Sequence, residues 1–285
     1  MDTVYLNGAY MALAEARISP LDRGFLFGDG VYEVIPTYGG RVVGFAPHID
    51  RLNRGLQEIG IELSEPYEYW QQICEQLSER NGGENLGLYL HLSRGADIKR
   101  AHAFPEGIEP TVFGHAFEIP ECDEPDREKH PGFKLHLAQD LRWRRCHIKT
   151  TSLLGNVMLF QQGLSQGNDE TILYNGSGEL TEGAMSNVFI VENGVVSTPV
   201  QDNQILGGIT RYLTLDILRE KTDIPVQERV ITVHEVRRAD EIWVTNSIDG
   251  IAPATSLDGA RVGDGKPGRV WEVVAKAYEE NKFFY

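Results

Sequence analysis

Lys149 differs from the other seven lysines of the sequence in its surroundings. No acidic residue lies near it, and an apolar segment follows it from Leu153 onwards. A lysine that attacks a carbonyl group must be uncharged, so it needs a desolvated or electropositive setting. Three arginines precede it and would favour the uncharged amine or hold an anion, namely Arg142, Arg144 and Arg145. An ordinary lysine at a strand end, with its charge in water, has the same pattern, so the context alone leaves both interpretations open.

Three places in the sequence could help to hold a phosphate group. Gly207-Gly208-Ile209-Thr210 stands directly before a predicted helix, where free backbone amides suit an anion and glycines allow it to approach closely. Asn246 and Ser247 offer further donors after a predicted strand, and Arg51 lies on another predicted helix. Many helices begin in this way, and an arginine on a helix face is usually solvated, so none of these signals decides by itself.

Glu182, in Thr181-Glu182-Gly183, is a candidate of a different kind. A glutamate in such a position is usually a surface residue. If it is buried, its carboxylate could hold a proton on the nitrogen of a pyridine ring. That proton makes the ring an electron sink for a substrate carbanion.

Apolar periodicity predicts both helices and strands in each half of the chain. Ile49, Leu52, Leu56 and Ile59 have the spacing of an amphipathic helix over 48–59. Alternation predicts a strand over 88–92, which leaves Tyr89 on its polar face. Further expected elements are a helix from 66 to 81, strands over 112–117 and from 133, a helix over 153–164, a hairpin of 188–191 with 195–198, a helix over 209–218, a strand over 241–245 and a helix over 270–278. Mixed elements without strict alternation favour two α/β-type domains that meet at a cleft.

A segment over 119–131 with three prolines and many charges is expected to act as a linker. We therefore predict a small N-terminal α/β domain over 1–120, an interdomain linker over 121–131 and a larger C-terminal domain over 132–285.

The composition disfavours several classes of protein. Hydrophobic residues make up 41% of the chain, which is enough for a folded core. The net charge of -15 argues against a nucleic-acid partner. Cys74, Cys122 and Cys146 form no C-x-x-C pair, so we expect no disulfide framework and no metal site. No secretory signal and no apolar run of membrane-spanning length is evident, so we expect a soluble cytoplasmic protein without a membrane partner.

Stretches along nearly the whole chain resemble the fold-type IV enzymes that use pyridoxal phosphate (PLP), and most closely the D-amino-acid (D-alanine) transaminases. Their order and spacing carry the resemblance rather than any one of them. The stretches are Asp22-Arg23-Gly24, Phe27-Gly28-Asp29-Gly30-Val31-Tyr32-Glu33, His48-Ile49-Asp50-Arg51-Leu52, Arg100-Ala101-His102, Ile148-Lys149 with Leu153-Leu154-Gly155, Thr181-Glu182-Gly183 with Ser186-Asn187-Val188-Phe189, and Gly208-Ile209-Thr210-Arg211. The resemblance implies a barrel-like α/β C-terminal domain, with the cofactor between the two domains.

The resemblance also implies a role for each candidate. Lys149 would hold PLP as an aldimine and later carry the proton between the substrate and the cofactor, and Glu182 would partner the pyridine nitrogen. Arg142 would stand behind the catalytic lysine. The implied phosphate site consists of Arg51, Ile209, Thr210, Asn246 and Ser247, although the family more often has a serine at position 246. The implied substrate site consists of Tyr32, Tyr89, Arg100 and His102.

Arg100 and His102 would bind the substrate α-carboxylate from the partner subunit, which implies a homodimer. A guanidinium and an imidazole can both donate hydrogen bonds to a carboxylate. The loop from Arg94 to Arg100 is one residue longer than the family pattern. This difference affects the position of Arg100, so it bears on the substrate prediction and not on the family prediction. The predicted reaction is transamination between D-amino acids, such as D-alanine or D-glutamate, and a 2-oxo acid acceptor.

Other functions stay open at this point. The same fold would also serve a branched-chain L-amino-acid transaminase, an (R)-amine transaminase or an aminodeoxychorismate lyase, and the Arg100 and His102 pair is the feature that argues against these. A PLP-binding protein without turnover is a second alternative. An unassigned α/β protein is the third.

Overall fold

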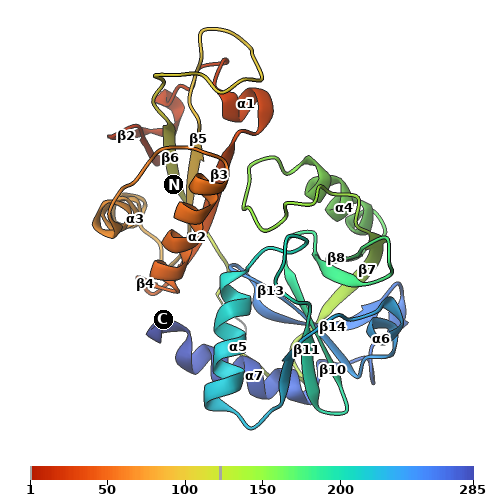
Figure 1. The fold of residues 1–285 in the computed structure, drawn as a ribbon. Helices are drawn as coiled ribbons and strands as arrows, with labels where there is room; N and C mark the ends of the chain where they lie inside the picture. The colour runs from red at the N-terminus through yellow and green to blue at the C-terminus, as the bar shows by residue number, and fades with distance from the viewer. Residues whose placement is uncertain (1, 122–123) are drawn as a thin grey trace. The chain divides into compact units, whose positions relative to one another are not determined.

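The computed structural model describes residues 2–121 and 124–285, so Cys122 and Asp123 of the predicted linker lie outside it. The described chain forms two compact units (Figure 1). Among the described residues, the first comprises 2–121 with 148–153 and 285, and the second comprises 124–147 with 154–284. The domain boundaries predicted above stay a prediction, because compact units need not fold independently.

The first unit contains a six-stranded sheet in the order β2-β1-β6-β5-β3-β4, and all five of its strand pairs are antiparallel. The helices α2 and α3 contribute to its apolar core. The elements are β1 (Thr3–Leu6), β2 (Ala9–Ala12), η1 (Leu13–Glu15), α1 (Arg23–Phe27), β3 (Gly30–Tyr38), β4 (Arg41–Val42), α2 (Phe45–Glu58), α3 (Tyr67–Asn81), β5 (Asn85–Ser93) and β6 (Thr111–Glu118).

Side-chain alternation gives this sheet two different faces. Leu86, Leu88, Leu90 and Leu92 of β5 are buried and join Ile49, Leu52 and Leu56 of α2 and Trp70, Ile73 and Leu77 of α3 in one core cluster. Tyr89 and His91 alternate with these leucines and therefore project from the other face. The helix predicted over 48–59 and the strand predicted over 88–92 are confirmed.

The second unit contains a nine-stranded sheet in the order β12-β11-β10-β13-β14-β7-β8-β9, with β15 paired to β14. The pairs β11–β12, β14–β7 and β7–β8 are parallel and the others are antiparallel. The end strand β9 also contacts β10 in the middle of the order, so the sheet curls on itself. This confirms the predicted barrel-like α/β architecture.

Helices pack against this curled sheet. Helix α4 contacts β7 and β8, whereas α5 and α7 contact each other and β13. The elements are β7 (Phe133–Gln139), α4 (Leu154–Leu164), β8 (Glu170–Tyr174), β9 (Leu180–Gly183), β10 (Asn187–Glu192), β11 (Val195–Thr198), α5 (Ile209–Lys221), β12 (Val226–Glu228), α6 (Val233–Arg238), β13 (Glu241–Asn246), β14 (Gly250–Leu257), β15 (Ala260–Arg261), α7 (Arg269–Asn281) and η2 (Lys282–Phe284).

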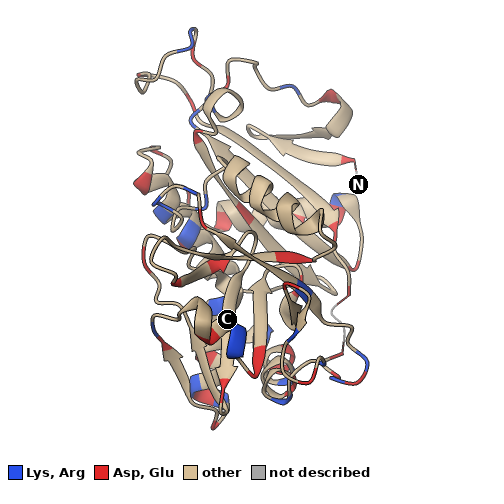
Figure 2. Ribbon diagram, turned by 90° about the vertical axis from the view of Figure 1, so that its right-hand side faces the viewer, with Lys and Arg blue, Asp and Glu red and all other residues tan. Residues whose placement is uncertain are grey.

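The hairpin predicted around Asn193-Gly194 is present between β10 and β11. Asn193 has a φ of 50° and Gly194 has a φ of 78°, the left-handed pair that a tight two-residue hairpin turn requires. Acidic and basic residues are interspersed over both units (Figure 2). Within the described residues, no helix is long and apolar enough to cross a bilayer.

Candidate active site

Lys149 belongs to a short segment, residues 148–153, that packs in the first unit. Its carbonyl oxygen accepts a hydrogen bond of 3.0 Å from the amide of Tyr32, and Thr151 donates from its amide to Gly30 at 3.0 Å. A β-bridge between Val31 and Thr150 lies between these two bonds. The Nζ atom of Lys149 lies 4.2 Å from the centre of the Tyr32 ring. The structure thus brings together the predicted catalytic lysine and one predicted substrate-binding residue.

Arg51 lies in a fully buried ion-pair cluster with Glu33 and His48. Its Nε and Nη2 atoms donate to the two Glu33 carboxylate oxygens, each at 2.7 Å, and His48 Nδ1 lies 2.7 Å from Glu33. Burial would raise the pKa of Glu33, but Arg51 and His48 outweigh it and hold that pKa well below its ordinary value. The cluster therefore fixes the guanidinium of Arg51, whose predicted contact with a phosphate stays a prediction.

The free face of the first sheet carries a band of aromatic side chains. The rings of Tyr32 and Tyr89 have centroids 5.6 Å apart, and Tyr89 lies 5.2 Å from the ring of His115. Burial raises the pKa of Tyr89 to about 12, so its hydroxyl group stays protonated. That hydroxyl lies 2.9 Å from Nδ1 of His91. Tyr32 and Tyr89 thus share one face of the sheet with two histidines.

Arg100 and His102 are exposed, in the loop between β5 and β6. The guanidinium of Arg100 lies 4.9 Å from the ring centre of Phe27, and the His102 ring lies 5.4 Å from the same ring. One aromatic side chain of α1 thus supports both residues of the predicted carboxylate site. Exposed cationic and imidazole donors so arranged are suited to an anionic group of a ligand.

In the second unit, Glu182 is buried on β9, with an exposed fraction of 4%. Its carboxylate accepts hydrogen bonds from Arg142 Nη1 at 2.8 Å, from the amide of Leu206 at 2.8 Å and from Asn187 Nδ2 at 3.2 Å. Burial raises the pKa of Glu182 to about 7 and outweighs the opposing charge of Arg142. Arg142 gives only one bond to Glu182, because its Nε and Nη2 atoms donate to Asp140.

The candidate phosphate site of this unit lies at the beginning of α5. Its N-cap residue, Gly208, makes no side-chain cap, so Ile209 and Thr210 stand in the first helical turn with helix-start amides. A Cβ atom at Gly208 would lie 2.0 Å from Oδ1 of Asn187, so any larger residue there would require the Asn187 side chain to move. Thr210 Oγ1 donates to the carbonyl of Asn246 at 2.9 Å, which brings the turn with Asn246 and Ser247 to this helix end.

Some of the predicted residues already have protein partners. The Asn246 side chain accepts from the amides of Ile248 and Asp249 and donates to the Asp249 carboxylate at 2.7 Å. This side chain thus shapes the turn after β13. The assignments of individual residues to cofactor and substrate stay predictions.

Sequence reasoning missed several residues that support the candidates. Asp140 and Asn187 hold Arg142 and Glu182, and Glu33 holds Arg51. Asn187 and Glu33 lie in stretches that carried the resemblance, which is the signal that could have found them. The amide of Leu206 gives no such signal, because every residue except proline has one.

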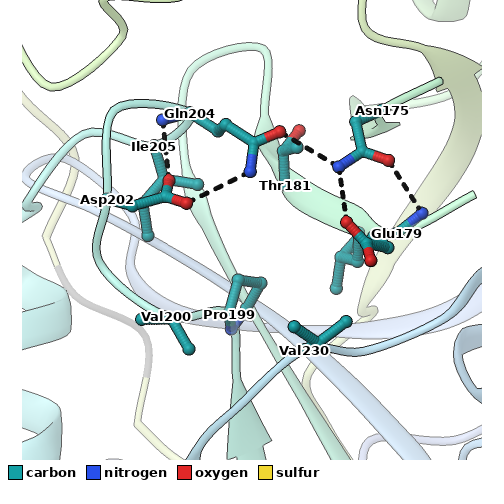
Figure 3. Close-up of a pocket in the computed structure, with 10 residues that line it drawn as sticks. Asn175, Glu179, Thr181, Pro199, Val200, Asp202, Gln204, Ile205 and Val230 are labelled. Atoms are coloured by element: carbon teal, nitrogen blue, oxygen red, sulfur yellow. Dashed lines mark hydrogen bonds between the residues drawn. The ribbon is translucent and has the colours of Figure 1, made fainter. Parts of the chain in front are cut away.

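A hollow in the second unit is lined by none of the predicted site residues. It is lined by Asn175, Glu179, Leu180, Thr181, Pro199, Val200, Asp202, Gln204, Ile205 and Val230 (Figure 3). Its polar groups largely bond one another, since Asn175 donates to Glu179 at 2.8 Å and to Gln204 at 3.0 Å. We therefore do not assign the site to this hollow.

Comparison with known proteins identifies the family. The family described as amino-transferase class IV matches residues 30–257. The chain is 36% identical to the D-alanine aminotransferase of Bacillus licheniformis, covering 98% of this chain and 96% of that protein. It is 34% identical to that of Staphylococcus haemolyticus, covering 98% of each. The chain belongs to the class IV aminotransferases.

A solved structure shows the same fold. The branched-chain amino acid aminotransferase from Escherichia coli has a TM-score of 0.88, and the match covers 99% of this chain and 94% of that one. Its identity of 22% supports the fold alone. The prediction of a fold-type IV aminotransferase is confirmed.

Proposed function

We propose that this aminotransferase uses PLP to transfer the amino group of D-amino acids, of the D-alanine or D-glutamate kind, to a 2-oxo acid. The observation that carries the proposal is the pair of Arg100 and His102 on the Phe27 ring, donors suited to a substrate carboxylate. The two relatives are named D-alanine aminotransferases, which supports the same substrate class.

The residues of the second unit fit the proposed cofactor. Glu182 is a buried carboxylate with a pKa of about 7, so Arg142 does not fully offset its burial and an additional proton donor would be favoured beside it. A protonated pyridine nitrogen is such a donor. The first turn of α5, entered through a glycine packed closely against Asn187, fits a phosphate group.

Each residue would then have one task in the reaction. PLP, when bound, supplies a ring that withdraws electrons from the substrate Cα. Glu182 keeps the proton on the ring nitrogen, and the α5 amides with Thr210 bind the phosphate. Lys149 holds the cofactor through its amine and moves the proton at the substrate Cα. Arg100, His102 and Tyr32 bind and orient the substrate carboxylate.

A donor panel tests this function. The protein, purified with PLP, is given D-alanine, D-glutamate, L-leucine or (R)-1-phenylethylamine, with 2-oxoglutarate or pyruvate as the acceptor. We expect turnover of the D-amino acids and its loss in Lys149→Ala. Lys134→Ala is the control, since Lys134 is an exposed residue of β7. Preference for L-leucine or the amine would overturn the substrate class, and full activity of Lys149→Ala would overturn the role of that lysine.

We further propose a homodimer in which Arg100 and His102 complete the site of the partner subunit. Large apolar side chains are exposed in both units, among them Phe25, Ile98, Leu154 and Met158, and such exposure favours a protein interface. Mixing and reassociating Lys149→Ala and Arg100→Ala subunits tests this. Random pairing would restore roughly a quarter of the wild-type activity if the two residues come from different subunits. No recovery, despite exchange of subunits, would contradict the shared site.

We also propose the cytoplasm as the compartment. Cys74 and Cys146 are free thiols, and burial raises the pKa of each to about 12. Such thiols stay protonated and unreactive, as suits a reducing compartment. Fractionation of the source cells with detection of the enzyme in each fraction tests this.

A further inference from the structure

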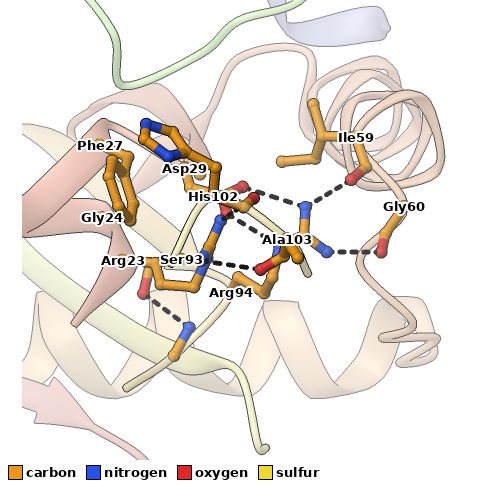
Figure 4. A network of polar contacts seen from close by, with 12 residues as sticks. Arg23, Gly24, Phe27, Asp29, Ile59, Gly60, Ser93, Arg94, His102 and Ala103 are labelled. Atoms are coloured by element: carbon orange, nitrogen blue, oxygen red, sulfur yellow. Dashed lines mark hydrogen bonds and ion pairs between the residues drawn. The ribbon is translucent and has the colours of Figure 1, made fainter. Parts of the chain in front are cut away.

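Two buried arginines and the partly buried Asp29 in the first unit form a cluster that binds the backbone next to Arg100 and His102. Arg23 and Arg94 are 3% and 7% exposed, and both donate to the carboxylate of Asp29 (Figure 4). Arg23 begins α1, Asp29 stands directly before β3 and Arg94 directly follows β5. We call these three residues the loop clamp.

Arg23 connects the clamp to the loop that carries the carboxylate donors. Its Nη1 atom donates to the carbonyl of Ala101 at 2.6 Å and to that of Ala103 at 3.3 Å, and its Nη2 atom donates to that of His102 at 3.4 Å. A single planar guanidinium therefore binds three successive carbonyl groups. Its Nε atom donates to Asp29 at 2.7 Å, which fixes the plane of the group.

Arg94 connects the same carboxylate to the end of α2. Its Nε and Nη2 atoms bind the two Asp29 oxygens at 2.9 Å and 3.0 Å. Its Nη1 and Nη2 atoms donate to the carbonyls of Gly60 at 2.7 Å and Ile59 at 2.6 Å, where a positive charge is favoured at the helix C-terminus. The ring of Phe104 lies 3.6 Å from the Arg94 guanidinium. The loop is thus held on both sides of His102.

Phe27 completes the arrangement. The guanidinium of Arg23 lies 4.9 Å from the centre of its ring, the same distance as that of Arg100. The positive charges of Arg23 and Arg100 on one ring, with Arg94 nearby, repel one another unless an anion compensates. Asp29 is the anion shared by Arg23 and Arg94, and their hydrogen bonds and charges overcome burial and lower the pKa of its carboxyl group.

We propose that Arg23, Asp29 and Arg94 are positioning residues that fix the loop over 101–104, so that Arg100 and His102 meet the substrate carboxylate as a preformed pair. This inference rests on the proposed function, since it concerns recognition of an amino acid. A loop that is already ordered before the substrate arrives loses no further conformational entropy when the substrate binds. Donor and acceptor both carry a carboxylate, so the clamp acts on both half-reactions.

Steady-state kinetics of Asp29→Asn test the proposal. We expect KM for D-alanine and for the 2-oxo acid to rise at least about tenfold, with kcat reduced less than about threefold. Glu228→Gln is the matched control, because Glu228 also accepts from two arginines, Arg211 at 2.8 Å and Arg219 at 2.7 Å, far from the loop in sequence. Equal KM changes in the two variants would overturn the proposal.

A double-mutant cycle separates positioning from general destabilisation. In an Arg100→Ala/His102→Ala background, Asp29→Asn should change kcat/KM by less than about threefold, because both residues that it positions are gone. A full additional loss would overturn the role. Arg94→Lys, which keeps the positive charge of a clamp residue, provides a milder variant should Asp29→Asn fold poorly, and the same cycle applies to it. Wild-type enzyme that turns over no D-amino acid would instead overturn the proposed function, before any variant is compared.

Discussion

Glu33 and Glu182 are both buried carboxylates that face an arginine, one in each unit, yet their pKa values move in opposite directions. Glu33 receives two bonds from Arg51 and a third contact from His48, so burial is outweighed and its pKa falls. Glu182 receives one bond from an arginine that gives two to Asp140, so burial prevails and its pKa rises to about 7. An arginine that binds a single carboxylate keeps that carboxylate ionised. An arginine shared by two carboxylates, as Arg142 is by Asp140 and Glu182, compensates the charge of Glu182 less, so Glu182 can accept a further proton donor.

The largest expected effect comes from removing the negative charge at Glu182. Glu182→Gln keeps the shape of the side chain but cannot hold a proton on a pyridine nitrogen by charge. We expect kcat to fall about 10³-fold, which corresponds to about 4 kcal/mol of transition-state stabilisation. Stopped-flow and steady-state kinetics measure this. A wild-type kcat in a PLP-loaded Glu182→Gln enzyme would contradict the need for a negative charge at position 182.

Glu33→Gln should lower the free energy of unfolding, and its main effect should not be on kcat. The change leaves Arg51 buried with its main counter-charge removed, which costs about 3–5 kcal/mol in the free energy of unfolding. Denaturant unfolding of the cofactor-free protein measures it. Glu33→Asp keeps the charge and should recover part of the loss. If Glu33→Gln is as stable as the wild type, Glu33 is not needed to compensate the buried charge of Arg51.

The two glutamates should also give opposite pH dependences. The pKa of Glu182 is raised from 4.5 to about 7, so its contribution to stability is present below pH 4.5 and is lost as the pH rises to 7. Between pH 4.5 and 7, the free energy of unfolding of the cofactor-free wild type should fall by up to about 3 kcal/mol relative to that of Glu182→Gln. Glu33 has a lowered pKa, so its contribution is present above pH 4.5 and is lost below it. Unfolding curves at several pH values measure both, and a flat difference would contradict the assignment.

Asp140→Asn should give the smallest change and sharpen the comparison. It removes the charge that competes for Arg142, so Glu182 should titrate at a lower pH. A less basic Glu182 holds the proton on the ring nitrogen less firmly, so kcat should fall no more than about tenfold, or about 1.4 kcal/mol. The pH of the stability change described above reports the titration. An unchanged midpoint would show that Asp140 has no part in it.

The sequence predicted the elements with strong periodicity, and it indicated candidate residues whose roles stay predictions. The helix of Ile49, Leu52 and Leu56, the alternation around Tyr89 and the turn at Asn193-Gly194 all express local patterns that the structure confirms. Strand β3 was missed because both of its faces are largely buried, which removes the alternation that marks a strand.

Long-range partners could not be predicted in the same way. The contacts of Arg23 with Ala101, His102 and Ala103 join residues about eighty positions apart, and backbone carbonyls leave no trace in the sequence. The sharing of Arg142 between Asp140 and Glu182 likewise depends on which strands become neighbours. The sequence therefore indicates candidate residues of the site, whose roles stay predictions, but not the groups that hold them.

The bridge between Val31 and Thr150 has a consequence for how the enzyme is made. The edge of β3 at Gly30 and Tyr32 is hydrogen-bonded by residues that lie more than a hundred positions later. During synthesis this edge stays open until the ribosome has translated past Thr151. A fragment that stops at residue 121 would keep it open permanently, and an unpaired strand edge invites aggregation. The short segment around Lys149 thus also acts as the last closure of the sheet that was synthesised first.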